Sequence, residues 1–312
     1  MLYCSNSMYK EVVILTNIYK KCTLCPRECK IDRDSIKGYC KTKSSLLITR
    51  AALHMWEEPC ISGTRGSGTI FFGGCSLGCI YCQNVQIRDG KTGKETDEHR
   101  LAEIFFELKD KGANNINLVT PTHFIPHIVK ALDIAKSKGL DIPIVYNTGG
   151  YEKVDTLKRL DGYVDIYLPD FKYYFEETAK EYSNAPDYPV YAKKAIAEMV
   201  RQTGCPSFFE NGIMKKGVIV RHLLLPGHLV ESKEIVKYLY NTYKNDIYIS
   251  IMNQYTPMPQ MANHKFLSEK VAESDYDELI NFAVDIGVEN GFIQEGETAT
   301  ESFIPPFDNS GV

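Results

Sequence analysis

From residue 65 onward, short apolar runs alternate with longer amphipathic stretches, and this alternation constrains the fold of the 312-residue chain more than any other feature. The expected strands cover residues 69–73, 115–119, 143–147, 164–168, 217–224 and 246–252. The expected helices between them cover residues 97–111, 123–138, 152–160, 175–183 and 229–243. Such alternation indicates a parallel α/β sheet. Periodicity alone leaves both a barrel and a doubly wound sheet open.

The remaining segments divide the chain into three expected regions. Residues 1–64 form a cysteine-rich extension that ends in a pair of short strands around Leu46 to His54. Residues 65–260 hold the alternating core, with an inserted helix near 189–203 and a short strand at Ser207 to Phe209. Residues 261–312 hold a helix near 272–287, a strand at 292–294 and a proline-rich tail, Ile304 to Asp308.

A cysteine loop follows the first expected strand of the core. Cys75, Cys79 and Cys82 have Cys-x3-Cys-x2-Cys spacing within a run that begins Gly73-Gly74. Three thiolates from one tight loop can hold three corners of a cubane iron–sulfur cluster, which normally takes four cysteine ligands. One iron then keeps an open position, as reactive metal sites do. A structural zinc site is the alternative, but zinc prefers four ligands.

A second cysteine group lies in the N-terminal extension, at Cys22, Cys25, Cys29 and Cys40. Four thiolates at this spacing can close a tetrahedral zinc site or hold an accessory cluster. Unmetallated thiols held by the fold are the alternative. Cys4, Cys60 and Cys205 lack partners by spacing, and we expect them to be buried or idle.

Polar residues fall at the carboxyl ends of the expected strands, where parallel barrels gather their reactive groups. They are Thr120, Thr122, His123, Asn147, Thr148, Asp170, Lys172, Arg221, Asn253 and Gln254. Each has a structural alternative. Thr122 can cap a helix, His123 can lie at the surface, and Asp170 and Lys172 can form a solvated ion pair. Arg221 lies in an apolar strand and needs an acceptor, either a ligand carboxylate or a structural salt bridge.

Charge and hydropathy exclude some partners. The net charge of −4, with no block of Lys and Arg, argues against a nucleic-acid backbone as the main partner. The apolar stretch Val12 to Ile18 is too short for a secretory signal, and no run approaches a membrane span. We therefore expect a cytoplasmic protein without a membrane partner, in which clustered cysteines bind metal or perform chemistry.

The loop from Cys75 to Cys82, with the aromatic Tyr81 before its last cysteine, resembles the signature of the radical S-adenosylmethionine (SAM) superfamily. The chain is also similar to the pyruvate formate-lyase activating-enzyme homologues. The segments that carry this closer similarity are Thr69–Phe72, Leu118–His123, Asp165–Lys172, Arg221–Gly227 and Met252–Pro257. The resemblance implies a partial (β/α)6 TIM-like barrel, a [4Fe–4S] cluster on the three loop cysteines, SAM as cosubstrate, and an anaerobic or microaerobic cell.

The resemblance also implies roles for individual residues. Tyr81 and Asn84 lie beside the cluster, Asn147 and Thr148 meet the ribose or carboxylate of SAM, and Asp170 and Lys172 reach the cofactor or substrate mouth. The superfamily's Gly-Gly-Glu-type segment, which holds the methionine amine of SAM, is replaced here by Val119-Thr120-Pro121-Thr122-His123. Hydroxyl and carbonyl oxygens of this segment can accept from an ammonium, but its carboxylate is missing.

The function that follows from the resemblance is reductive cleavage of SAM to a 5′-deoxyadenosyl radical, with flavodoxin or ferredoxin as the electron donor. The leading hypothesis is an oxidoreductase that activates a protein partner by abstracting a backbone glycine hydrogen. Radical modification of a small molecule or a peptide is the first alternative. A non-catalytic iron–sulfur or zinc scaffold protein is the second.

Overall fold

The structure is a computed structural model that describes residues 18–294 and 305–312. Cys4, residues 12–17 of the apolar N-terminal stretch, and Ile304 at the start of the proline-rich tail lie outside the described residues.

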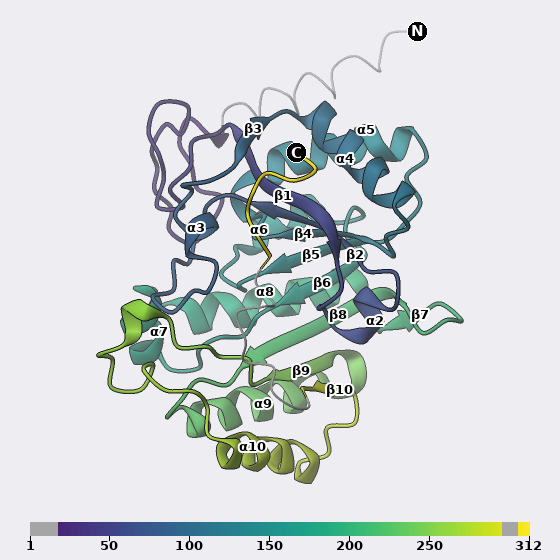
Figure 1. Cartoon of the computed structure of the whole chain (residues 1–312). Coiled ribbons are helices and arrows are strands. Elements are labelled where there is room, and N and C mark those ends of the chain that lie inside the picture. The colour runs from purple at the N-terminus through teal and green to yellow at the C-terminus, as the bar shows by residue number, and fades with distance from the viewer. Residues whose placement is uncertain (1–17, 295–304) are drawn as a thin grey trace, which may run out of the picture.

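The centre of the molecule is one ten-stranded sheet in which the six expected strands run parallel (Figure 1). They are β2 (Ser67–Phe72), β4 (Ile116–Val119), β5 (Ile144–Thr148), β6 (Ile166–Pro169), β8 (Met214–Leu223) and β9 (Tyr248–Met252). Their order in space follows their order in the chain, and β10 (Gly291–Ile293) extends it by one parallel strand. A doubly wound sheet reverses its strand order at a switch point. Because the strand order here is not reversed, the fold is a partial barrel and not a doubly wound sheet.

Two antiparallel strands complete the edge of the sheet next to β2. β1 (Leu46–His54) pairs with β2 on one side and with β3 (Lys94–Thr96) on the other. The expected pair of short strands around Leu46 to His54 is therefore wrong, because these nine residues form one strand whose partners come from elsewhere in the chain. The described C-terminal residues 305–312 lie along β1, where Ala51 N donates to Ser310 O at 2.9 Å.

The larger helices match the expected ones within a few residues. They are α4 (Glu98–Asp110), α5 (Ile125–Ser137), α7 (Glu176–Ser183), α8 (Tyr188–Thr203), α9 (Leu229–Tyr243) and α10 (Glu273–Asp285). The expected helix at 152–160 is short, with α6 (Val154–Leu157) followed by the 3-10 turn η2 (Lys158–Leu160). Local chemistry fixes one boundary clearly: the Asp97 side chain accepts from Arg100 N and so caps α4.

Besides the strand β3, two short helices were not expected from the sequence. α2 (Pro59–Ser62) follows β1, and α3 (Val85–Arg88) follows the cysteine loop. Each is only one turn long, so its hydrophobic periodicity is too short to mark it. The inserted strand is confirmed as β7 (Ser207–Phe208), which pairs antiparallel with β8.

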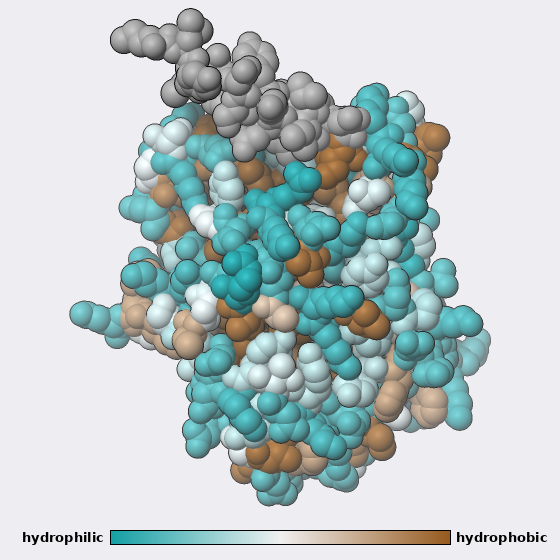
Figure 2. Space-filling model, turned by 180° about the vertical axis from the view of Figure 1, so that it is seen from behind, coloured by the Kyte–Doolittle hydropathy of each residue, from teal (hydrophilic) through white to brown (hydrophobic). Residues whose placement is uncertain are grey.

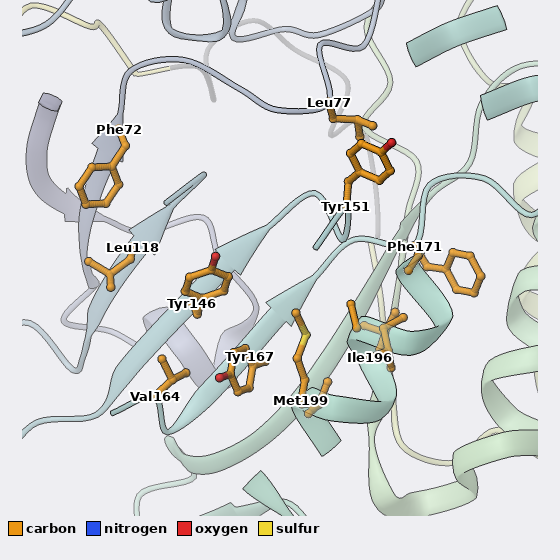
Figure 3. Close-up of a cluster of buried hydrophobic side chains, with 14 of the residues drawn as sticks. Phe72, Leu77, Leu118, Tyr146, Tyr151, Val164, Tyr167, Phe171, Ile196 and Met199 are labelled. Carbon is orange, nitrogen blue, oxygen red and sulfur yellow. The ribbon is translucent and has the colours of Figure 1, made fainter. Parts of the chain in front are cut away.

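Alternating strand residues form two apolar layers. On the outer layer, Tyr146 of β5 and Tyr167 of β6 lie near Ile196 and Met199 of α8 (Figure 3). On the inner layer, Val145, Ile166 and Leu168 pack with Cys60 and Ile61 of α2. This period of two places successive side chains on opposite faces of each strand. The helix α2 thus fills the inside of the partial barrel, and the expected burial of Cys60 is confirmed.

The rear face of the molecule is mostly polar. Figure 2 shows the rear face as largely hydrophilic, with hydrophobic residues in small separate groups. Within residues 18–294 and 305–312, no helix has the length and apolar character needed to span a bilayer.

Candidate active site

The cysteine loop begins directly after β2 and is held by tight backbone contacts. Gly74 has φ +89°, and a Cβ atom there would lie 2.4 Å from Cys40 O. Cys75 N donates to the same carbonyl oxygen at 3.2 Å. Only glycine combines this left-handed conformation with so close an approach. The conformation of the cysteine loop therefore depends on its close packing against the N-terminal extension at Cys40.

The expectation that His123 lies at the surface is wrong. His123 is buried, and its Nε2 donates to Gly73 O at 2.8 Å. Burial, and then the charge of Arg33, lowers the pKa of His123 to about 3, so the ring is neutral. His123 O in turn accepts from Arg33 at 2.8 Å. His123 is thus a structural link between the cysteine loop and the N-terminal extension.

The three loop cysteines lie at one cavity of about 300 Å³, at the carboxyl ends of the parallel strands. The same cavity is lined by Tyr81, Asn84, Thr120, Thr122, Asn147, Thr148, Asp170, Lys172 and Arg221, whereas His123 and Asn253 are not among its lining residues. Gln254 also lines it. Residues from six different strands and loops therefore meet at a single place, as parallel-barrel topology predicts.

The donor set fits an iron–sulfur cluster. Burial, together with the neighbouring thiols, raises the pKa of Cys82 to about 12 and also raises the pKa of Cys75. Such thiols become thiolates only beside a strong positive charge, which iron supplies. No group of three or more His, Cys, Asp and Glu in residues 18–294 and 305–312 is arranged around a single metal ion.

A chain of hydroxyl groups reaches the middle cysteine. Ser183 Oγ donates to Cys79 Sγ at 3.1 Å and contacts Tyr173 OH at 2.7 Å. Tyr173 OH donates to Tyr81 OH at 3.0 Å. Tyr81 is buried against the rings of Tyr173, Tyr182 and Tyr255. Hydrogen bonds to cluster sulfurs tune reduction potential, and no sequence motif marks Ser183 or Tyr173.

A partly buried ion network lines the same cavity as the cysteines. Asp170 accepts from Lys172 Nζ at 2.6 Å and from Arg221 Nε at 3.0 Å. Arg221 also donates to Glu57 at 3.0 Å and to Asn147 Oδ1 at 2.6 Å. All three guanidinium nitrogens therefore have protein partners, and the Asp170–Lys172 pair is largely withdrawn from solvent, with side chains 15% and 19% exposed.

The charges in this network stabilise one another. Burial opposes ionisation of Asp170, but the positive charges of Lys172 and Arg221 outweigh it and lower the pKa of Asp170. Burial likewise opposes the charge of Lys172, but Asp170 raises the pKa of Lys172 above its usual value. Glu57, from the loop after β1, was not predicted because β1 lies outside the parallel alternation. The predicted contact of Arg221 with a SAM carboxylate stays a prediction.

A buried carboxyl group lies under the two threonines of the site. Glu152 Oε1 accepts from Thr122 Oγ1 at 2.6 Å and also accepts from Thr148 Oγ1. Glu152 is 1% exposed, its Oε2 has no hydrogen-bond partner among the described residues, and burial raises its pKa to about 7. The Thr122 side chain makes no helix cap, so that alternative is wrong.

The segment that replaces the usual glutamate motif is strained. Thr120 has φ +57°, a left-handed conformation that is unfavourable for a β-branched residue. Its N–H donates to Asn147 O at 2.9 Å, which joins the ends of β4 and β5. Strain of this kind is concentrated at functional sites.

The N-terminal cysteines lie together beside this site. Cys22, Cys25 and Cys40 are buried, and Cys29 is partly exposed. Tyr39 N donates to Cys29 Sγ at 3.4 Å, and a Cβ atom at Gly38 would lie within 3.8 Å of both Cys29 Sγ and Cys40 Sγ. Burial raises the pKa of Cys25 to about 12. Metal binding by these four residues stays a prediction. Cys205 is exposed and donates to Asp246 at 3.5 Å.

The Arg27 side chain connects the N-terminal extension to the cysteine loop and to the end of α7. Its guanidinium donates to Ser76 O and Leu77 O in the cysteine loop, each at 3.0 Å. It also donates to Ser183 O at 2.7 Å and to Asn184 O at 2.5 Å, at the end of α7. One side chain thus connects three segments that are far apart in the sequence.

Comparisons with known proteins agree with this arrangement. A family model described as the Radical SAM superfamily matches residues 69–239. An uncharacterized protein of Methanocaldococcus jannaschii, MJ0674, is 27% identical over 290 residues, which cover 89% of this chain and 78% of the relative.

Solved structures share the fold. The crystal structure of Streptococcus suis SuiB bound to precursor peptide SuiA matches 73% of this chain and 48% of SuiB, with a TM-score of 0.50 and 17% identity. The chain thus spans about half the length of SuiB. At this identity the match shows a common fold.

Proposed function

The chain belongs to the radical SAM superfamily, and from this premise we propose that it is an activating enzyme that abstracts a backbone glycine hydrogen from a protein partner. The superfamily uses a [4Fe–4S] cluster and SAM for radical chemistry. A cluster held by Cys75, Cys79 and Cys82 would supply the electron for reductive cleavage of SAM, and thereby the radical that takes hydrogen from the substrate. The remaining work of binding, orientation and exclusion of water belongs to this chain's residues.

The observation that carries the proposal is the convergence of the three loop thiols, one buried and two partly buried, and six strand ends on one cavity. In our proposal Cys75, Cys79 and Cys82 hold the cluster. Thr122 and Thr148 present hydroxyl oxygens to the methionine ammonium of SAM, and Glu152 orients both hydroxyls by accepting a hydrogen bond from each. A carboxylate from the neighbouring strand end then replaces the one missing from the segment after β4.

The charge distribution of the cavity supports a backbone substrate. Lys172 and Arg221 are already paired with Asp170 and Glu57, so the wall offers little unpaired charge to a charged metabolite. A peptide backbone carries no net charge, so a site that binds it needs only hydrogen-bond donors and acceptors. Trp56 lines the cavity and is 65% exposed, which suits contact with a protein surface at the mouth. The similarity to activating-enzyme homologues motivates the same substrate class.

Radical modification of a peptide is the second candidate. SuiB, whose fold this chain shares, was crystallised with its precursor peptide. In both candidates the electron donor is a small redox protein such as flavodoxin or ferredoxin.

The test is anaerobic reconstitution with iron and sulfide, reduction with dithionite, and assay of 5′-deoxyadenosine formed from SAM. We expect slow cleavage in the wild type and none in Cys75→Ala, Cys79→Ala or Cys82→Ala. Incubation with candidate glycyl-radical proteins should then give a glycyl-radical signal by electron paramagnetic resonance. Cleavage that is stimulated by a peptide or a metabolite, without a glycyl radical in any partner, would instead favour the second candidate or small-molecule modification.

A further inference from the structure

Residues 18–44, which we call the basic module, carry a charge opposite to that of the chain as a whole. The module has eight Lys and Arg against three Asp and Glu, a net charge of +5, whereas the whole chain has −4. The rest of the chain is therefore strongly acidic. Six lysines of the module are exposed: Lys20, Lys21, Lys30, Lys37, Lys41 and Lys43.

Most of this positive charge is not neutralised within the protein. Lys20 pairs with Asp32 and Asp34, and Glu28 pairs with Lys153 outside the module. Among the described residues, no carboxylate lies within ion-pair distance of the other five exposed lysines. Lys91, in the turn where a Cβ atom at Gly90 would lie 2.9 Å from Lys41 O, is exposed but pairs with Asp89 at 3.7 Å, so it adds no net charge to the module.

The module lies directly against the cysteine loop. In Figure 1 it forms the purple loops beside α3, the helix that follows that loop. Lys41 is covalently next to Cys40, whose carbonyl oxygen accepts from Cys75 N at 3.2 Å. One peptide unit and one hydrogen bond therefore separate an exposed cation from a predicted cluster ligand. Arg27 adds two hydrogen bonds from the module to the loop, at Ser76 O and Leu77 O.

We propose that the basic module is the docking surface for a small acidic electron-transfer protein, and this inference rests on the proposed function. The negative remainder of the chain repels an acidic partner, whereas the module attracts it, so long-range attraction orients the encounter. The step is a transfer of one electron: the reduced cofactor of the donor protein loses it, the oxidised cluster gains it, and no covalent bond forms or breaks. Docking at the module places the donor beside Cys75.

The test compares two triple variants of equal charge change. Lys37→Glu/Lys41→Glu/Lys43→Glu reverses three exposed charges on the module. Lys138→Glu/Lys215→Glu/Lys216→Glu reverses three exposed charges, at the C-terminal end of α5 and the amino end of β8, whereas the cavity lies at the carboxyl ends of the strands. Binding of flavodoxin and, separately, of ferredoxin to the full chain is measured by anaerobic titration at an ionic strength of about 0.01 M, where the Debye length is about 30 Å. Carbodiimide cross-links are then mapped by mass spectrometry.

We expect the module variant to weaken donor binding about tenfold or more and the control variant to bind as well as wild type. Wild-type binding should weaken steeply with salt, and cross-links should join module lysines to donor carboxylates. The proposal is overturned if neither donor binds, if both triple variants bind alike, or if the cross-links lie elsewhere. Dithionite reduces the cluster without a docking protein, so an assay with dithionite distinguishes failure of this proposal from failure of the proposed function. Both variants should cleave SAM with dithionite as well as wild type does, and a wild type that fails to do so contradicts the function itself.

Discussion

At the scale of single residues, the most informative side chain is one that no motif marks. Glu152 lies two residues after Gly150, at the first position of the helix expected over residues 152–160, where nothing in the sequence marks it as part of the site. The structure gives it two threonine donors and an unpartnered second oxygen. A carboxyl group is rarely buried without a role, because burying it costs free energy.

Replacement of Glu152 tests its role in SAM binding. Glu152→Ala removes the acceptor that orients Thr122 and Thr148, and we expect the Kd for SAM to rise about tenfold or more, the scale of one hydrogen bond to a charged group. Anaerobic equilibrium dialysis measures this Kd. The iron content and cluster absorbance should stay unchanged, because Glu152 does not touch the loop cysteines. An unchanged Kd at full iron content would remove Glu152 from the site.

The pH dependence of stability tests the burial of the same group. The folded pKa of Glu152 is about 7, above its ordinary value of 4.5. Its neutral form therefore favours the folded state fully below pH 4.5, and this contribution is lost as the pH rises through 7. Between pH 4.5 and 7.5 the wild type should lose about 3 kcal/mol of unfolding free energy relative to Glu152→Gln. Urea unfolding of the metal-free proteins across this range measures the difference, and parallel pH profiles would contradict it.

The partly buried ion network gives a third prediction. Arg221→Met leaves Asp170 and Glu57 without their shared cation, and we expect a loss of about 3 kcal/mol in unfolding free energy. The lowered pKa of Asp170 means that its contribution is present above its ordinary pKa of 3.8 and is lost as the pH falls through the folded value. The destabilisation should therefore be larger at pH 7 than at pH 3. Denaturant unfolding at the two pH values checks this.

At the scale of elements, the parallel strands and most helices could be predicted because each has enough residues to display its period. The carboxyl ends of those strands also predicted that Thr122, Asp170 and Arg221 lie near the cysteines. The one-turn helices α2 and α3 and the three-residue strand β3 show no period. Glu57 follows an antiparallel strand, and its contact with Arg221 across 164 residues is a tertiary contact that spacing cannot reveal.

Two glycine variants test whether the cysteine loop needs its close approach to Cys40. Gly74→Ala combines an unfavourable φ of +89° with a 2.4 Å clash against Cys40 O, whereas Gly112→Ala has φ +90° and open space around it. Both variants carry the backbone cost of about 1 kcal/mol. Only Gly74→Ala should also displace the loop and lower the iron bound after reconstitution. Equal iron content in the two variants would show that the close approach to Cys40 is unimportant.

At the scale of the whole molecule, the cysteine-rich extension is not an appendage. Arg33 donates to His123 O, Arg27 reaches the end of α7, and Cys40 O accepts from Cys75 N. The domain boundaries at residues 64 and 260 stay predictions. These contacts nevertheless mean that a change in the extension is transmitted to the catalytic loop through ordinary hydrogen bonds.

Metal analysis of the whole chain decides what the extension holds. If Cys22, Cys25, Cys29 and Cys40 bind a second cluster, anaerobic reconstitution should give about eight irons per chain, and Cys25→Ser/Cys29→Ser should reduce this to about four. If they bind zinc, about four irons and one zinc should be found, and the same variant should lose only the zinc. Cys60→Ser/Cys205→Ser is the control, since neither residue belongs to either group, and its metal content should match wild type. About four irons without zinc in the wild type would mean that these four thiols are held by the fold alone, and that the contacts of Arg27 and Arg33 suffice to keep the extension on the catalytic loop.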